Sequence, residues 1–134
     1  QLAYRLRHDE RVVVMERTDI RDVTVGEGSK SLPASADLAV VDVSFVSLTK
    51  VLEAVSGLVA PGGMIVAMAK PQFEAGKALA DKYKGVIPLG PERDEVLAAL
   101  RAWVGERFDI VAEADSGVAG AEGNLERFMV LRAR

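Results

Sequence analysis

The stretch from Asp37 to Lys70 has an apolar pattern that predicts a strand followed by a helix. Leu38 to Val41 is an unbroken apolar run, which is typical of a parallel strand buried on both faces of a sheet. Ser47 can cap the following helix, because its hydroxyl can accept a hydrogen bond from an amide of the first turn. The apolar positions of that helix recur every three or four residues, at Leu48, Val51, Leu52, Val55, Leu58 and Val59.

A second buried strand is predicted at Met64 to Ala69, after a turn at Pro61 to Gly63. Strand, helix and strand units of this kind are almost always right-handed and parallel, so both strands end at the same edge of the sheet. Asp42 follows the first strand and Lys70 follows the second. We therefore expect a carboxylate and an ammonium group to face one crevice, at the edge where open α/β sheets bind ligands. The alternative is that each residue only marks where the chain reaches solvent.

The rest of the chain predicts further strands of the same sheet. Val12 to Met15 is interpreted as a short buried strand, and Phe108 to Ala114 with Arg127 to Leu131 as an antiparallel hairpin that closes the sheet. A helix is predicted to begin at Pro91, because proline is favoured in the first turn of a helix. Residues 23–36 are polar and rich in glycine and serine, and are predicted to form a surface loop. The pattern as a whole predicts an open, mostly parallel α/β sheet.

Composition fits one soluble globular domain over residues 1–134. Of these residues, 49% are hydrophobic and 28% are charged, and no apolar run approaches the length of a membrane span. Cysteine is absent, which excludes disulfides and thiolate metal sites and fits a reducing cytoplasm. We therefore expect a cytoplasmic protein with no metal and no membrane partner. The net charge of −3 gives no overall attraction to a polyanion, so charge alone does not predict nucleic-acid binding.

Two sequence blocks carry a resemblance to a known family. VDVSFVSL, around Asp42, and AKPQFEAGK, around Lys70, resemble the TlyA (haemolysin A) family of ribosomal RNA 2′-O-methyltransferases, which belongs to the larger FtsJ-like group. The resemblance runs from QLAYRLRHDERVVVMERTDIR to GNLERFMVL, nearly the whole chain. It implies the Rossmann-like fold of methyltransferases that use S-adenosylmethionine, a three-layer sandwich. It also implies that the chain is one partial domain, lacking the amino-terminal part.

The resemblance also implies roles for particular residues. FtsJ-like enzymes use a Lys-Asp-Lys-Glu tetrad, and three of its members correspond to Asp42, Lys70 and Glu126, with Lys70 as the proton acceptor. The first lysine of the tetrad would lie upstream of Gln1. A ribose hydroxyl must be made more basic and aligned with a methyl donor before it can be methylated, and a neutral lysine with orienting carboxylates suits that task. Spacing alone does not identify this reaction.

The implied cofactor is S-adenosylmethionine, and the implied partner is ribosomal RNA or a ribosomal subunit. The glycine-rich loop and the acidic residue with which the family holds the cofactor have no counterpart here. The implied remainder of the cofactor site is Thr18, Asp19, Asp42 and Val43. Another departure is the sequence IPLGPE, where family members tend to carry Arg-Asp-Pro. We therefore expect residues 1–134 alone to be inactive.

Without its family neighbours, the strand at Val12 to Met15 would be disordered, paired at another edge, or completed by a second chain as a homodimer or through strand exchange. Three alternatives to an RNA methyltransferase remain. One is a non-catalytic remnant or adaptor that binds RNA or ribosomes and no cofactor. A second is a nicotinamide or flavin dehydrogenase, which the lack of a G-x-G-x-x-G motif disfavours. A third is a membrane-lytic protein, which would need a basic amphipathic helix that the sequence does not contain.

Overall fold

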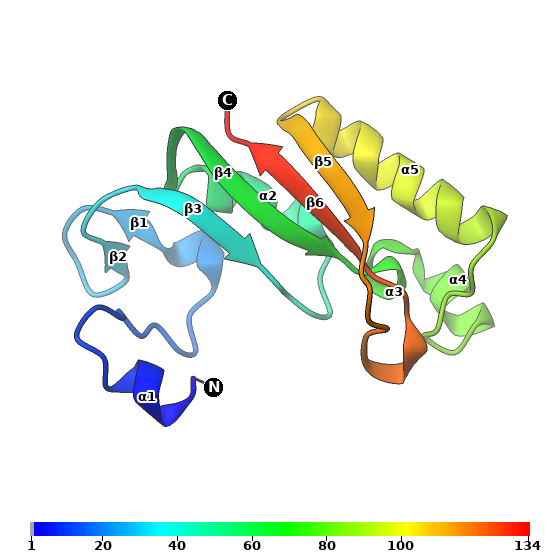
Figure 1. Ribbon diagram of the computed structural model, residues 1–134, viewed down its shortest axis with the longest axis horizontal. Helices are drawn as coiled ribbons and strands as arrows, with labels where there is room; N and C mark the ends of the chain where they lie inside the picture. Colours follow the sequence, from blue (N-terminus) through cyan, green and yellow to red (C-terminus); the bar gives the residue numbers. More distant parts are fainter. Residues whose placement is uncertain (1) are drawn as a thin grey trace.

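The computed structural model describes residues 2–134, apart from the side chain of Ala121. Its main feature is a four-stranded sheet with the strand order β3-β4-β6-β5 (Figure 1). The strands of this sheet are β3 (Ala36–Val41), β4 (Val59–Ala69), β5 (Asp109–Asp115) and β6 (Arg127–Arg132). Two very short parallel strands, β1 (Thr24–Val25) and β2 (Ser31–Leu32), lie within the segment that was expected to be loop.

The helices are short, with one exception. The α-helices are α1 (Tyr4–Arg7), α2 (Leu52–Ser56), α3 (Pro71–Glu74), α4 (Lys77–Lys82) and α5 (Pro91–Gly105), and the 3₁₀ helices are η1 (Ile20–Asp22), η2 (Leu48–Lys50) and η3 (Ala121–Gly123). The start of α5 at Pro91 is confirmed. In the part of the chain that the structure describes, no helix has the length and apolar character needed to cross a membrane.

The pairing of β3 with β4 confirms the predicted parallel unit. Leu38 is paired with Met64 and Val41 with Ala67, so the two strands end together. β6 pairs antiparallel with both β4 and β5, which confirms the predicted hairpin. Only one of the three pairings in this sheet is parallel, so the expectation of a mostly parallel sheet is wrong for residues 2–134. The reason is that the hairpin supplies half of the strands.

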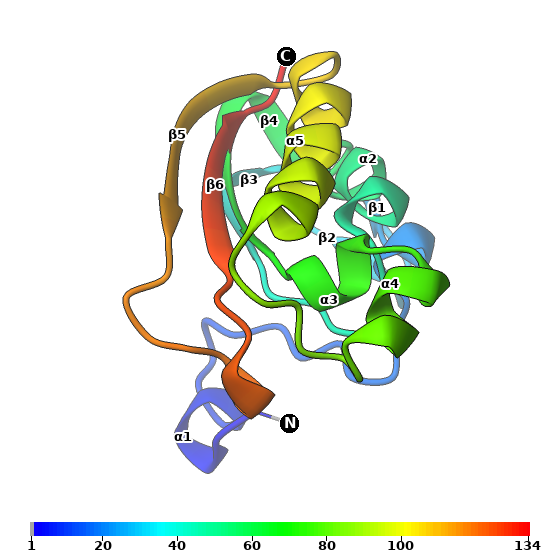
Figure 2. The same ribbon diagram turned by 90° about the vertical axis from the view of Figure 1, so that its right-hand side faces the viewer.

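The core lies between one face of the sheet and the helices α2 and α5. Side chains of alternate strand residues point to this face, as the two-residue repeat of a strand requires. Figure 2 shows the helices α2 to α5 on the same side of the sheet. The buried side chains at this interface include Val41, Ile65, Ala67, Met129 and Leu131 from the strands, and Leu52, Val55, Leu97, Leu100 and Val104 from the helices.

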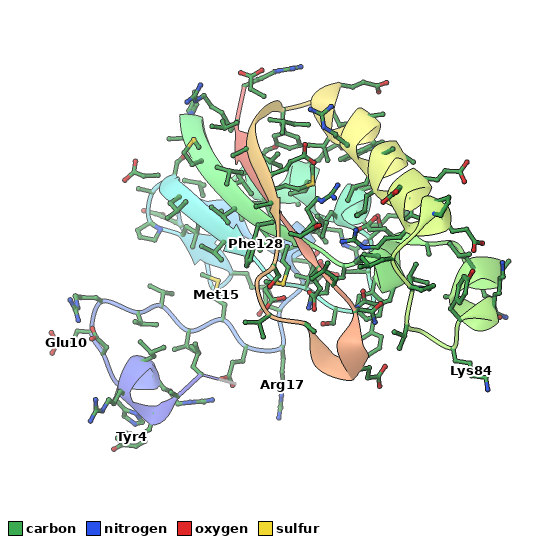
Figure 3. The ribbon with its side chains drawn as sticks, turned by 45° about the vertical axis from the view of Figure 1, so that its right-hand side comes forward. Tyr4, Glu10, Met15, Arg17, Lys84 and Phe128 are labelled. Carbon is green, nitrogen blue, oxygen red and sulfur yellow. The ribbon has the colours of Figure 1, made fainter. Side chains whose placement is uncertain are left out.

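The opposite face of the sheet is largely uncovered by residues 2–134. Val40 is 73% exposed, and Leu38, Val111 and Phe128 also remain exposed. Figure 3 shows Phe128 on this face and Met15 pointing toward it from the amino-terminal segment. The expectation of strands buried on both faces is therefore wrong, because the described helices form one layer. Two of the three layers of the expected sandwich are present.

Two local predictions are also corrected. Val12 to Met15 forms no strand among the described residues and pairs with neither β3 nor β5, the edge strands of the sheet. Its completion by a second chain stays a prediction. Pro61 to Gly63 does not end the helix, which already stops at Ser56. These residues instead lie inside β4, where the pairing with β3 is irregular.

Gly63 in this irregular part of β4 generates a testable prediction. A Cβ atom at Gly63 would lie 2.4 Å from Cγ1 of Val59 and 2.8 Å from the backbone oxygen of Ala60. We expect Gly63→Ala to lower the free energy of unfolding by about 1–3 kcal/mol, the usual cost of overpacking. Urea denaturation measures this change. The matched control is Gly117→Ala, since a Cβ there meets no atom within 4 Å. An equal effect of both substitutions would contradict the packing argument.

Candidate functional site

The carboxyl ends of β3 and β4 bring Asp42 and Lys70 together. Nζ of Lys70 lies 2.8 Å from Oδ1 of Asp42 and donates a hydrogen bond to Oγ of Ser44 at 3.1 Å. The Lys70 side chain is only 12% exposed, whereas that of Asp42 is largely open to solvent. The prediction that these two side chains meet at one edge of the sheet is thus confirmed. It follows from the common end point of two parallel strands.

Glu126 approaches the same ammonium group from the start of β6. Its Oε2 atom is 3.8 Å from Nζ of Lys70, and its side chain is 8% exposed. Oε2 has no hydrogen-bond partner in the described structure, although buried polar atoms normally have one. A Cβ at Gly120 would lie 1.9 Å from Oε1 of Glu126, so any other residue there would force this carboxylate to move.

Two buried polar residues hold the segment that precedes Glu126. Asn124 accepts a hydrogen bond from the backbone amide of Ile87 at 3.0 Å and donates one to the backbone oxygen of Gly85 at 2.8 Å. Arg93, buried in the first turn of α5, donates to the backbone oxygen of Leu125 at 2.9 Å and pairs with Asp115 at 3.1 Å. Partial burial raises the pKa of Asp115, but hydrogen bonds from arginine outweigh it and leave that pKa below its ordinary value.

A pocket of about 380 Å³ opens beside Lys70 and Glu126. Phe45 and Phe73 form one part of its lining, with ring centroids 4.9 Å apart. Phe45 is 89% exposed and has a φ of +63°, a left-handed conformation that is costly for a bulky residue. The remaining lining residues are Ser44, Gln72, Ala80, Gly85 and Glu122.

A second pocket, of about 340 Å³, lies along the free edge of β3. Asp42 and Val43 line it together with Ile20 and with apolar residues of β3 and α2. Thr18 and Asp19 are not part of its lining, although Asp19 immediately precedes Ile20. Asp19 caps η1 and pairs with Arg21 at 2.6 Å, and the side-chain hydrogen bond from Arg21 lowers its pKa to about 2. Of the four residues expected at a cofactor site, Asp42 and Val43 line this pocket, and Thr18 and Asp19 do not.

Sequence reasoning missed several residues of this region. Ser44 and Phe45 belong to the DVSF block, and Phe73 and Glu74 to the KPQFE block, so their place in those blocks was the available signal. Nothing in the sequence indicates the left-handed backbone of Phe45. Three lysines, Lys77, Lys82 and Lys84, lie between α3 and α5, and all three are exposed. Lys82 also pairs with Glu92. Figure 3 shows Lys84 pointing away from the sheet.

Comparison with known proteins identifies the class. The family model of the FtsJ-like methyltransferases matches residues 1–134. The chain therefore belongs to the FtsJ-like methyltransferase family. Within that family its relatives place it with the TlyA proteins. It is 37% identical over 134 residues to the 16S/23S rRNA (cytidine-2′-O)-methyltransferase TlyA of Mycobacterium tuberculosis (strain ATCC 25618 / H37Rv), covering 100% of this chain and 48% of that protein.

Two further relatives agree with this grouping. Hemolysin A of Brachyspira hyodysenteriae is 32% identical over 127 residues, covering 94% of this chain and 51% of that protein. The solved structure of a hemolysin-like protein from Streptococcus thermophilus superimposes with a TM-score of 0.87 at 31% identity, covering 99% of this chain and 47% of that chain. The chain thus spans about half the length of the relatives it matches. The methyltransferase fold expected from the sequence is confirmed.

The site yields a prediction about Glu74, a half-buried carboxylate four residues after Lys70. Burial raises its pKa, and hydrogen bonds from Ser47 and Leu48 offset that effect only in part. The folded chain therefore binds this proton more readily than the unfolded chain does. The resulting stability is fully present below pH 4.5 and is lost as the pH rises through the folded-state pKa.

We expect the parent chain to gain stability relative to Glu74→Gln between pH 7 and pH 4. Urea denaturation of both proteins at the two pH values measures the difference. A relative loss of parent stability on acidification would contradict the direction of the pKa change.

Proposed function

We propose that this chain takes part in 2′-O-methylation of ribosomal RNA that depends on S-adenosylmethionine, as the carboxyl-terminal part of a catalytic domain. The observation that carries this proposal is the cluster of Asp42, Lys70 and Glu126, in which Lys70 and Glu126 line a pocket that also presents two phenylalanine rings. The name of the TlyA relative of Mycobacterium tuberculosis, an rRNA (cytidine-2′-O)-methyltransferase, supports it. Membership of the FtsJ-like methyltransferase family supports the reaction type.

Lys70 is proposed as the group that accepts the proton of the ribose 2′ hydroxyl. Its amine must be neutral for this step, and a positively charged methyl donor nearby favours the neutral form. Asp42 and Ser44 orient the amine, at 2.8 Å and 3.1 Å. Glu126 offers a buried acceptor that has no hydrogen-bond partner in the described structure, and a donor on the bound ribose would satisfy it. Alignment and proton removal together lower the barrier.

The aromatic part of the pocket supports a nucleotide as substrate. Base stacking on aromatic side chains is a common way to hold a nucleotide that has left its helix. Phe45 is exposed at the pocket, next to Phe73, in a conformation whose cost suggests a functional reason. We propose that these rings hold the base of the target nucleotide while its ribose faces Lys70.

The pocket beside β3 is proposed for the adenosine side of the cofactor. Its lining is largely apolar, which suits an adenine ring, and it adjoins Asp42 and Val43. Asp19 could meet the adenine edge only after releasing Arg21, which it now pairs with. When bound, S-adenosylmethionine supplies the electrophilic methyl group. The residues described here would hold only part of it. The alternative of an adaptor that binds no cofactor is tested by the cofactor titration that closes this section.

Replacement of Lys70 tests the catalytic assignment. In the full natural protein we expect Lys70→Ala to abolish methyl transfer and to leave cofactor affinity within about threefold, because a proton acceptor acts on the transition state. Asp42→Ala should lower both, since Asp42 lines the cofactor pocket as well. A tritiated-methyl assay on ribosomal RNA measures the activity, and calorimetry measures the affinity. Activity of Lys70→Ala equal to the parent would remove Lys70 from this role.

Residues 1–134 alone should bind S-adenosylmethionine only weakly. We expect a dissociation constant in the millimolar range, about three powers of ten weaker than a micromolar site, because Asp42 is the one charged residue among the apolar side chains that line the pocket beside β3. Isothermal titration calorimetry measures this, and the same chain should show no methyl transfer. Micromolar binding would reveal a complete cofactor site within these residues. If the full natural protein also fails to bind the cofactor, the adaptor alternative replaces the enzyme.

A further inference from the structure

Beyond the ends of β3 and β4, the segments 42–48 and 70–74 run side by side. They contact each other in the same order along both segments, which keeps them in a fixed register. The contacts in that order are Lys70 with Asp42 and Ser44, Phe73 with Phe45, and Glu74 with Ser47 and Leu48. Of these residues, Lys70, Ser44, Phe45 and Phe73 line the pocket proposed for the substrate. The contacts of Glu74 with Ser47 and Leu48 lie at the end of the two segments that is farther from Lys70.

Glu74 makes this last contact with both oxygens of its carboxylate. Oε1 accepts a hydrogen bond from the backbone amide of Leu48 at 2.8 Å, and Oε2 accepts one from Oγ of Ser47 at 2.5 Å. Oγ of Ser47 in turn accepts a hydrogen bond from the amide of Thr49 at 3.1 Å and thereby caps η2. One carboxylate therefore fixes the start of η2 to α3, the helix that directly follows Lys70.

The contact lies outside the pocket that contains Lys70. Glu74, Ser47 and Thr49 line a separate cleft of about 270 Å³, whose other side is formed by α5 residues that include Leu100 and Trp103. None of these three residues lines the pocket beside Lys70. Any effect of Glu74 on methyl transfer must therefore pass through the positions of other residues.

We propose that Glu74 is a positioning residue for methyl transfer. It fixes segment 42–48 against segment 70–74, and so sets where Asp42, Ser44 and Phe45 lie relative to Lys70. This inference rests on the proposed function. A carboxylate suits the task because both of its oxygens accept, and the two groups that face it both donate. An amide keeps one acceptor for the Leu48 amide, but it turns its other group, a donor, toward Ser47, so the short hydrogen bond from the Ser47 hydroxyl to a charged oxygen is lost and the register is held less tightly.

The test is Glu74→Gln in the full natural protein, assayed for methyl transfer to ribosomal RNA. We expect kcat to fall about 10- to 100-fold, the scale on which a displacement of about 1 Å acts. The KM for RNA should stay within about threefold, since Glu74 touches no substrate. The thermal midpoint should stay within about 5 °C of the parent, because the change conserves shape and loses at most one weak interaction. A merely structural role would instead lower the midpoint and leave kcat per folded molecule unchanged.

Glu113→Gln is the matched control, because Glu113 pairs with Arg101 at 2.6 Å on β5, away from both segments. It should keep the parent kcat. In a Ser47→Ala background, Glu74→Gln should cause a smaller further loss than it causes alone, since Ser47 supplies one of the two hydrogen bonds that Glu74 accepts.

An active parent with an equally active Glu74→Gln variant would overturn this inference alone. A parent that transfers no methyl group would overturn the proposed function and this inference together.

Discussion

The parallel pairing of β3 with β4 is the constraint on which the rest of the site depends. Because Val41 is paired with Ala67, the two strands leave the sheet at the same level, and the residues that follow them meet. The antiparallel pairing of β6 with β4 then brings the start of β6 to the same edge, where Ala69 is paired with Arg127. Three strand ends thus deliver an ammonium group and two carboxylates to one place. No long side chain has to cross the molecule for this.

The surroundings of the ammonium group show how a buried charge is tolerated. Lys70 is nearly enclosed, and burial of an unpaired ammonium would be very unfavourable. Asp42 supplies a partner that keeps contact with water, whereas Glu126 supplies one that is itself buried. The second carboxylate in turn depends on Gly120, Asn124 and Arg93 for the shape of its segment. The polar residues far from Lys70 are therefore part of its environment.

The fold could be predicted from the sequence wherever local pattern and topology agree. The convergence of Asp42 and Lys70 followed from two apolar runs and the handedness rule. Glu126 was found only by resemblance, because its partner lies 56 positions earlier in the chain and no local pattern links the two. Val12 to Met15 was misjudged because apolar content shows that a segment can form a strand, but not that a neighbouring strand exists. The hydrogen bonds of Glu74 to Ser47 and Leu48 could be found only in the structure, since nothing in the sequence separates a half-buried glutamate from one on the surface.

The uncovered face of the sheet has a consequence for how residues 1–134 behave in water. Leu38, Val40, Val111 and Phe128 form an apolar surface on strands, and such surfaces favour adhesion to other apolar surfaces. The free edge of β3 adds unpaired backbone groups beside it, which can extend a sheet between molecules. A net charge of only −3 opposes such contacts weakly. We therefore expect these exposed strand side chains to limit the solubility of residues 1–134 when they are produced alone.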